Sequence, residues 1–196
     1  MTEPILTVAN QLTMLRMMLA PFLVVTVLDR EFTWALVIFV VAGVTDLLDG
    51  LIARLGHQKT TLGAMLDPVA DKVLLVSSFV ALTWGPGLVV RIPVWLAVIA
   101  LSRDAIIVVS VTVINLTLGR RVFYPSILGK VTTVSQIVTT GVVLLLNALG
   151  AEYPPTVYLF WFTVVVTVAS AFHYVYLESV GRGMGEASHD RGSPNG

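Results

Sequence analysis

The sequence predicts an all-α polytopic membrane protein with six transmembrane helices and both termini in the cytoplasm. Hydrophobic residues make up 56% of the 196 residues and charged residues only 12%, about half the ~25% charged share of soluble domains. The mean hydropathy is +0.88, and a single soluble core of this size cannot bury so much apolar surface. Long apolar stretches divided by short polar breaks indicate a bilayer as the solvent.

The apolar stretches predict the helices in order. The first four contain ionisable residues: 12–28 (Arg16), 32–54 (Asp46, Asp49), 62–84 (Asp67, Asp71, Lys72) and 92–118 (Arg103, Asp104). The last two, 131–151 and 153–177, carry no formal charge over 21 and 25 residues. Each is long enough to cross a hydrocarbon core of about 30 Å. The breaks hold turn residues, such as Gly85-Pro86-Gly87.

Basic residues predict the orientation. Six spans place both termini on one side, and the opposite loops hold only Arg30 and Arg91 as basic residues. The loops and tail on the side of the termini hold Arg54, Lys59, Arg120, Arg121, Lys130, Arg182 and Arg191. The positive-inside rule therefore predicts cytoplasmic termini in a bacterial inner membrane.

One membrane domain is expected over residues 1–180, with 1–11 as a short interfacial segment. Residues 181–196 are rich in Gly, Ser and charge, which predicts a disordered tail. The first apolar stretch lacks the features of a removable signal peptide. The charges of the 12 acidic and 12 basic residues cancel, which argues against a nucleic-acid-binding surface. The chain has no Cys, which excludes disulfides, thiolate catalysis and Cys-based zinc sites.

Four aspartates lie near the loop between the second and third predicted helices. Asp46 and Asp49 are three residues apart, and Asp67 and Asp71 are four apart. Both spacings place a pair on one helix face, with Cβ atoms about 5–6 Å apart. Because the loop is short, we expect the two helices to be antiparallel neighbours whose acidic faces meet. An ionisable side chain within a membrane helix costs roughly 2.5–3.5 kcal/mol, so this cluster indicates function.

Four converging carboxylates in a medium of low dielectric constant need cations to stay charged. Their all-oxygen ligand set favours Mg²⁺ or Mn²⁺. Four carboxylates can bridge two such ions, and a two-metal site suits displacement at phosphorus. The structural alternative is that the acids form buried ion pairs with Arg54, Lys72 or Arg103.

Residues between the acids narrow the chemistry. Gly50, Ala53, Gly63 and Ala64 let a ligand approach the backbone closely, or let helices pack closely in a membrane. Arg54 either binds an anionic group bidentately or anchors the helix end at the cytoplasmic face.

The complete pattern is Asp46-x2-Asp49-Gly50-x2-Ala53-Arg54-x8-Gly63-x3-Asp67-x3-Asp71, eight residues over 26 positions. It resembles the signature of the CDP-alcohol phosphotransferases (phosphatidyltransferases), integral-membrane enzymes of phospholipid synthesis, with no departure at any position. The resemblance extends to residues 10–16, 66–72 and 129–132.

The resemblance implies transfer of a phosphatidyl group from CDP-diacylglycerol to an alcohol, with release of CMP. It implies metal ligation by Asp46, Asp49 and Asp67, and a double role for Asp71 as part of the metal site and as general base. Gly50, Ala53, Arg54 and Gly63 would line the donor pocket. The resemblance also implies six transmembrane helices, a homodimer, and an active site open to the cytoplasmic leaflet.

Cations outside the signature are candidates for binding the acceptor: Arg103, Arg120, Arg121 and Lys130. Arg103 either binds the acceptor or pairs with an aspartate, and the other three either bind acceptor phosphate or form a collar at the lipid headgroups.

Two subfamilies resemble the chain. Phosphatidylglycerophosphate synthases, whose acceptor is glycerol 3-phosphate, usually carry a second Arg about two turns after the one at Arg103, where this chain has Val111. Cardiolipin synthases of the mitochondrial type use phosphatidylglycerol, which has one charge fewer. The balance therefore favours phosphatidylglycerol.

Intramembrane acids are also typical of cation- or proton-coupled transporters, which is the alternative from another class. That alternative predicts acids and broken helices in two related halves of the chain, whereas the four signature aspartates lie in one half.

Overall fold

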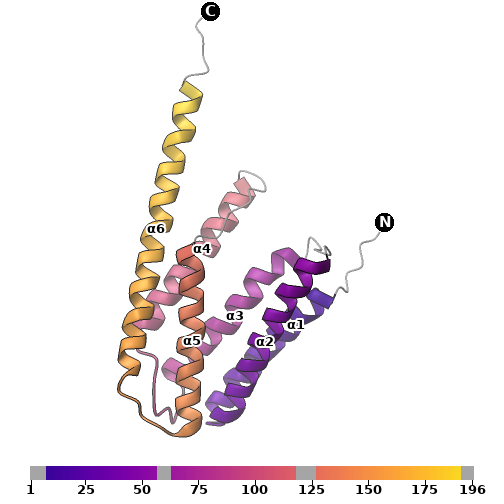
Figure 1. Cartoon of the computed structure of the whole chain (residues 1–196), viewed down its shortest axis with the longest axis vertical. Coiled ribbons are helices and arrows are strands. Elements are labelled where there is room, and N and C mark those ends of the chain that lie inside the picture. The colour runs from indigo at the N-terminus through magenta and orange to yellow at the C-terminus, as the bar shows by residue number, and fades with distance from the viewer. Residues whose placement is uncertain (1–7, 57–62, 118–126, 191–196) are drawn as a thin grey trace, which may run out of the picture.

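The computed structural model describes the backbone of residues 8–56, 63–117 and 127–190, and the side chains of residues 14–46, 72–109 and 127–173. Within these ranges the chain is all-helical (Figure 1). The helices are α1 (Val8–Leu28), α2 (Phe32–Gly56), α3 (Gly63–Trp84), α4 (Val94–Thr117), α5 (Ile127–Leu149) and α6 (Thr156–Asp190). The predicted number and order of helices are confirmed, and most ends agree to within a few residues.

The helices run alternately in opposite directions, so α1 begins and α6 ends toward the same end of the bundle (Figure 1). Helix α1 packs against α2 and α3, α5 against α2, α3 and α6, and α4 against α3 and α6. Among the described residues, α2 and α3 are not an extensively packed pair, and each packs on α1 instead. The expectation that their acidic faces meet near the connecting loop falls on residues 47–71, whose side chains lie outside the described residues.

Two helix ends show how the predicted breaks form. After α1, Arg30 has a positive φ of 63°; its N–H donates to Val27 O, and Glu31 N–H donates to Thr26 O. This is the Schellman arrangement, in which a left-handed residue lets the last carbonyls of a helix find donors. Gly150 repeats it after α5, with a φ of 61°. Glycine adopts this conformation at little cost, whereas at Arg30 the side chain makes it costly.

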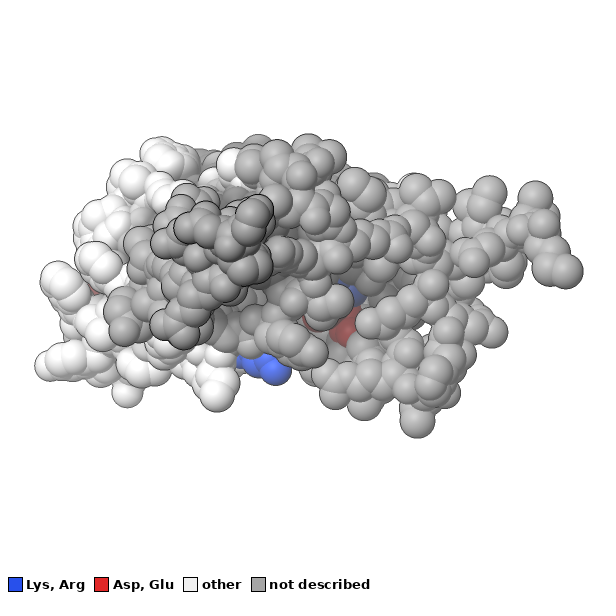
Figure 2. Space-filling model, turned by 90° about the horizontal axis from the view of Figure 1, so that it is seen from above, with Lys and Arg blue, Asp and Glu red and all other residues white. Residues whose placement is uncertain are grey.

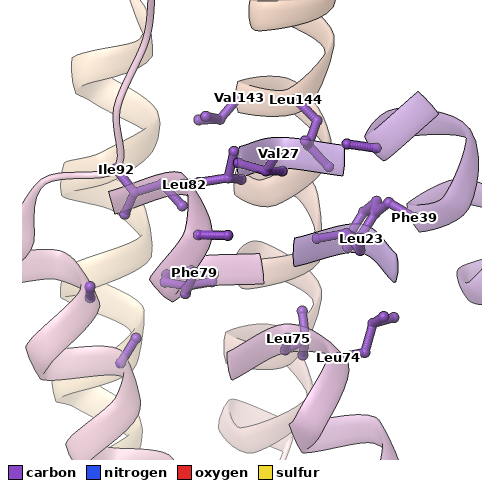
Figure 3. Close-up of a cluster of buried hydrophobic side chains, with 14 of the residues drawn as sticks. Leu23, Val27, Phe39, Leu74, Leu75, Phe79, Leu82, Ile92, Val143 and Leu144 are labelled. Atoms are coloured by element: carbon purple, nitrogen blue, oxygen red, sulfur yellow. The ribbon is translucent and has the colours of Figure 1, made fainter. Parts of the chain in front are cut away.

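The core joins all six helices. It includes Leu23 and Val27 of α1, Phe79 and Leu82 of α3, and Leu144 of α5, all of which are nearly inaccessible. Figure 3 shows these side chains pointing toward one another between the ribbons. Because lipid tails are as apolar as these side chains, close van der Waals packing and not removal from water lets this contiguous cluster fix how the helices meet.

The outer surface carries many large apolar side chains. Every helix carries exposed large hydrophobic residues, for example Trp34 at 61% and Phe172 at 72% exposure. Soluble monomers rarely expose apolar patches of this extent. Among the described residues, Ile127–Leu149 and Thr156–His173 are long and apolar enough to cross a membrane. Length and composition therefore support two of the six predicted spans, and the exposed apolar side chains of the other helices suit a lipid solvent.

Helices α5 and α6 bury hydroxyl groups as well as hydrocarbon. Thr139 Oγ1 and Thr163 Oγ1 lie 2.8 Å apart across the two helices. Most other buried hydroxyls donate to a carbonyl one turn earlier in their own helix, as Thr167 does to Thr163 O. Such bonds satisfy polar groups where no water competes.

Asn147 anchors the connection between α3 and α4. Its Oδ1 accepts from the N–H groups of Val89 and Val90, and its Nδ2 donates to Val90 O and Val143 O. The side chain is 4% exposed. One amide therefore satisfies backbone groups of a non-helical segment that packs against α5.

Helix α6 is longer than the sequence predicts. Its backbone remains helical to Asp190, so ten residues of the segment 181–196 that we expected to be a disordered tail continue the helix. Each glycine in this segment costs about 1 kcal/mol relative to alanine. However, residues 181–193 contain no proline, and only proline removes the backbone donor that a helix needs.

Candidate functional site

The signature residues occupy the end of α2 and the beginning of α3. The backbone of α2 carries Asp46, Asp49, Gly50, Ala53 and Arg54 in its last turns, and that of α3 carries Gly63, Asp67 and Asp71 in its first turns. The helical backbone confirms the spacing argument, since residues three or four apart share a face. Of these side chains only that of Asp46 belongs to the described residues.

Asp46 is held by a buried arginine of α1. Arg16 Nη2 lies 2.6 Å from Asp46 Oδ1, and the two side chains are 4% and 48% exposed. A charge-assisted bond of this length is strong and directional. Seen from the end of the bundle where α2 ends, acidic and basic atoms lie close together (Figure 2). The arrangement orients one oxygen of the carboxylate and leaves nearly half of the side chain accessible to a ligand.

A second charged cluster joins α3, α4 and α6; we call it the Asp104 cluster. Asp104 Oδ2 lies 2.8 Å from Lys72 Nζ, and Asp104 Oδ1 accepts at 2.9 Å from Arg103 Nη1. Arg103 Nη2 also donates to Ser170 Oγ at 2.7 Å. Arg103 and Asp104 are 7% and 4% exposed. Two cations face one carboxylate, so the cluster carries one excess positive charge.

The Asp104 cluster bears on the structural alternative for the signature acids. Two of the three cations that were candidates for neutralising them, Lys72 and Arg103, pair with Asp104 instead. The side chain of the third, Arg54, lies outside the described residues. The cation that pairs with Asp46 is Arg16.

The predicted metal ligands can be compared only in part. Among the described residues, no group of three or more acidic, His or Cys side chains is close enough to hold a metal ion. The side chains of Asp49, Asp67 and Asp71 lie outside that set. Asp46 is the one predicted ligand whose side chain can be compared with the needs of a metal ion. Its carboxylate is oriented and half exposed, and carboxylate oxygens are the ligands that a hard divalent cation prefers.

The predicted acceptor residues fall into three groups. Arg103 is buried and engaged by Asp104 and Ser170. Lys130 lies on the exposed side of the first turn of α5. Arg120 and Arg121 lie outside the described residues. No contact among the described residues brings Lys130 to Arg103.

Sequence reasoning missed two partnerships. It noted Arg16, Lys72 and Asp104 as ionisable residues in apolar helices but did not pair them, because each pair joins different helices and no local spacing relates them. Ser170 gave no signal beyond being polar in an apolar stretch. The cost of burying a lone charge was the available clue, since such charges require partners.

Comparison with known proteins gives consistent results. The family model described as CDP-alcohol phosphatidyltransferase matches residues 6–169. A human protein named cardiolipin synthase (CMP-forming) is 35% identical over 189 residues, covering 87% of this chain and 61% of its own length. The cardiolipin synthase (CMP-forming) of Streptomyces coelicolor is 35% identical, covering 76% of this chain and 70% of its own length.

A Salmonella choleraesuis protein carries a different name, CDP-diacylglycerol–glycerol-3-phosphate 3-phosphatidyltransferase. It is 36% identical over 174 residues, covering 84% of this chain and 90% of its own length. The chain thus spans less than two thirds of the human relative but more than two thirds of the Streptomyces and Salmonella relatives.

Proposed function

The chain belongs to the CDP-alcohol phosphatidyltransferase family, and we propose that it transfers a phosphatidyl group from CDP-diacylglycerol to a glycerol-bearing acceptor and releases CMP. One observation carries the proposal. The complete acidic signature lies at the connected ends of α2 and α3, and its first carboxylate, Asp46, is held by the buried Arg16. A buried arginine and an oriented acid in an apolar bundle are costly to keep without a role.

Asp46, Asp49, Asp67 and Asp71 would hold two divalent cations, Mg²⁺ or Mn²⁺. The chemistry of the donor set supports this, because four carboxylates offer only oxygen ligands. The cations would supply charge neutralisation for the pyrophosphate of the donor. Arg16 keeps the Asp46 carboxylate in a fixed orientation, so less ordering of that side chain is needed when a ligand binds.

The residues of the chain then have defined tasks. Gly50, Ala53 and Gly63 leave space for the cytidine diphosphate, and Arg54 pairs with its phosphate oxygens. Asp71 accepts the proton of the acceptor hydroxyl. That oxygen forms a bond to the lipid-side phosphorus, the bond from this phosphorus to the CMP oxygen breaks, and CMP leaves with the electron pair.

Phosphatidylglycerol is the proposed acceptor, which would make the product cardiolipin. Two relatives named cardiolipin synthase, from human and Streptomyces coelicolor, support this acceptor. The uncharged Val111 also supports it, because an additional cation at that position would suit a more highly charged acceptor. Glycerol 3-phosphate is the second candidate, favoured by the Salmonella relative. Arg103, Arg120, Arg121 and Lys130 are the proposed acceptor-binding cations.

The proposed setting is a bacterial inner membrane, with all six helices spanning it and the active site open to the cytoplasm. The two long apolar helices, the exposed apolar side chains on every helix and the basic residues near one end support this topology. We also propose a homodimer, because the resemblance to the family implies one.

Asp71→Asn tests the mechanism. It should abolish CMP release with any acceptor, while binding of CDP-diacylglycerol, measured by equilibrium binding to purified protein, is retained in part because three carboxylates remain. Equal loss of binding and turnover would make Asp71 a ligand and not the base. Mass spectrometry of the wild-type lipid product, with phosphatidylglycerol and glycerol 3-phosphate supplied separately, identifies the acceptor.

A further inference from the structure

All four tryptophans of the chain lie at one end of the bundle. They occupy the start of α2, the last residue of α3, the start of α4 and the second turn of α6. This end lies opposite the end where α2 finishes and α3 begins with the signature residues (Figure 1). Two tyrosines lie at the same end, and we call the six residues the aromatic belt: Trp34, Trp84, Trp95, Tyr153, Tyr158 and Trp161.

The rings of the aromatic belt face outward. The four tryptophan side chains are 40–61% exposed, and Tyr153 and Tyr158 are 57% and 75% exposed. Within the described part of the chain, no group accepts a hydrogen bond from an indole N–H of the belt. Each belt residue therefore offers an apolar ring and a polar tip to its surroundings. Such side chains are enriched where lipid meets water, because the ring contacts hydrocarbon while the tip reaches water or a lipid carbonyl.

Charge changes sharply at the level of the belt. The three connections at this end of the bundle hold five charged residues: Asp29, Arg30, Glu31, Arg91 and Glu152. Inward from the belt, each helix has at least nine consecutive uncharged residues: 17–28, 32–45, 73–84, 94–102, 131–149 and 156–177. A step from charged connections through aromatic rings to uncharged helices matches the passage from water into hydrocarbon.

We propose that the aromatic belt binds the headgroup and carbonyl region of the bilayer leaflet away from the candidate site. The proposal rests on the proposed membrane setting and adds the depth at which the protein sits. The connections at this end carry three acidic and two basic residues, which suits the side that the positive-inside rule leaves poor in basic residues.

The belt sets the depth of the candidate site. Asp46 is twelve residues from Trp34 on α2, and Lys72 is twelve residues from Trp84 on α3. Twelve residues rise about 18 Å along a helix axis, which is more than half of a hydrocarbon core of about 30 Å. The ion pairs of Asp46 and Lys72 therefore lie inside the hydrocarbon region, in the half away from the belt. Unpaired charges are costly at this depth, and both side chains have a partner of opposite charge.

Helices α4 and α6 connect the belt to the Asp104 cluster. Both helices begin at the belt, where the ring centroids of Trp95 and Trp161 lie 5.2 Å apart. Eight residues farther along α4 and nine farther along α6, Arg103 donates to Ser170. The same pair of helices therefore makes one contact at the belt and a second about 12–14 Å deeper. A belt fixed at the interface holds Arg103 at a fixed depth.

Depth-dependent fluorescence quenching tests the proposal. The wild-type protein is reconstituted in phosphatidylcholine vesicles that contain lipid brominated either near the headgroup or near the end of the acyl chain. Because all four tryptophans lie at the proposed interface, we expect bromines near the headgroup to quench the emission more strongly than bromines near the chain end. Stronger quenching by bromines near the chain end, or no quenching by either lipid, would overturn the proposal.

Single-tryptophan proteins resolve the belt residue by residue. Four variants each keep one tryptophan and carry Phe in place of the other three, and each should show the order of quenching expected for the wild type. The matched control lacks all four tryptophans and carries Phe172→Trp on α6. Phe172 is 72% exposed and lies eleven residues beyond Trp161, about 16 Å deeper. The order of quenching should reverse in this control, and the same order in the control and the belt variants would overturn the proposal.

The quenching experiment needs no donor, acceptor or metal, so it is independent of turnover. If the belt is quenched as expected and no CMP is released under any condition, the proposed transferase function fails and the position of the belt stands. If CMP is released but bromines near the chain end quench the belt more strongly, the proposed position of the belt fails and the transferase function stands.

Discussion

Asp104→Asn is the most informative perturbation of the fold, because Asp104 neutralises two cations from different helices. The substitution keeps the shape of the side chain and removes its charge. Lys72 on α3 and Arg103 on α4 then lose the carboxylate that lies 2.8 and 2.9 Å away. Arg103 retains its hydrogen bond to Ser170, but a neutral hydroxyl group does not neutralise the charge of the guanidinium.

The expected loss of stability follows from burial. Removing one partner of a buried ion pair costs about 3–5 kcal/mol. Since the amide oxygen of asparagine still accepts a hydrogen bond from one of the two cations, we take the lower value of about 3 kcal/mol. For a chain of this size about 1 kcal/mol shifts the Tm by roughly 2–4 °C, so Asp104→Asn should lower the Tm by roughly 6–12 °C.

Thermal unfolding of the purified protein in detergent measures this shift. Glu152→Gln removes an exposed carboxylate and serves as the matched control, with an unchanged Tm. Combining Asp104→Asn with Lys72→Gln removes one of the two stranded cations and should restore part of the loss. If Asp104→Asn unfolds at the same temperature as the control, Asp104 does not neutralise the cluster and the charge argument is wrong.

Three further substitutions test separate parts of the structure. Arg16→Gln removes the partner of Asp46 and should raise the metal concentration needed for half-maximal CMP release roughly 10–100-fold. Arg91→Gln is the control. An unchanged metal dependence in Arg16→Gln would contradict an orienting role for Arg16. Asn147→Leu removes four hydrogen bonds and should cost about 3 kcal/mol of unfolding free energy, seen as a lower Tm; no decrease would mean that the α3–α4 connection does not need this anchor. Gly85→Ala places a Cβ 2.5 Å from Ala81 O and should lower the Tm. In Gly43→Ala the new Cβ meets nothing within 4 Å, so this control should add about 0.5–1 kcal/mol to the free energy of unfolding. Equal shifts of the Tm in the two variants would contradict the close packing at Gly85.

The helices could be predicted because their signals are local. Apolar stretches and turn residues predicted six helices and the breaks after α1 and α5. The acidic signature likewise predicted which turns of α2 and α3 carry the candidate site. Hydrophobic length and backbone conformation are properties of neighbouring residues, so one sequence suffices to infer them.

The contacts between helices could not be predicted in the same way. Nothing in the spacing of Lys72 and Asp104, 32 positions apart, indicates that they meet, and several arrangements of six apolar helices would satisfy the same pattern. The position of α1 against both α2 and α3 depends on side-chain packing around Leu23 and Val27. Arg30 is a different case, where the local hydrogen bonds that end α1 hold a backbone conformation that the residue type does not favour.

Release of CMP by the purified wild-type protein tests the central claim most directly. The protein is freed of metal with a chelator and then supplied with CDP-diacylglycerol, phosphatidylglycerol and either Mg²⁺ or Mn²⁺. The account predicts CMP in proportion to cardiolipin formed, no CMP without metal, and recovery when metal is restored. Absence of metal-dependent CMP release with phosphatidylglycerol, glycerol 3-phosphate and other alcohols alike would contradict the proposed transferase function. The intramembrane acids would then favour the transporter alternative.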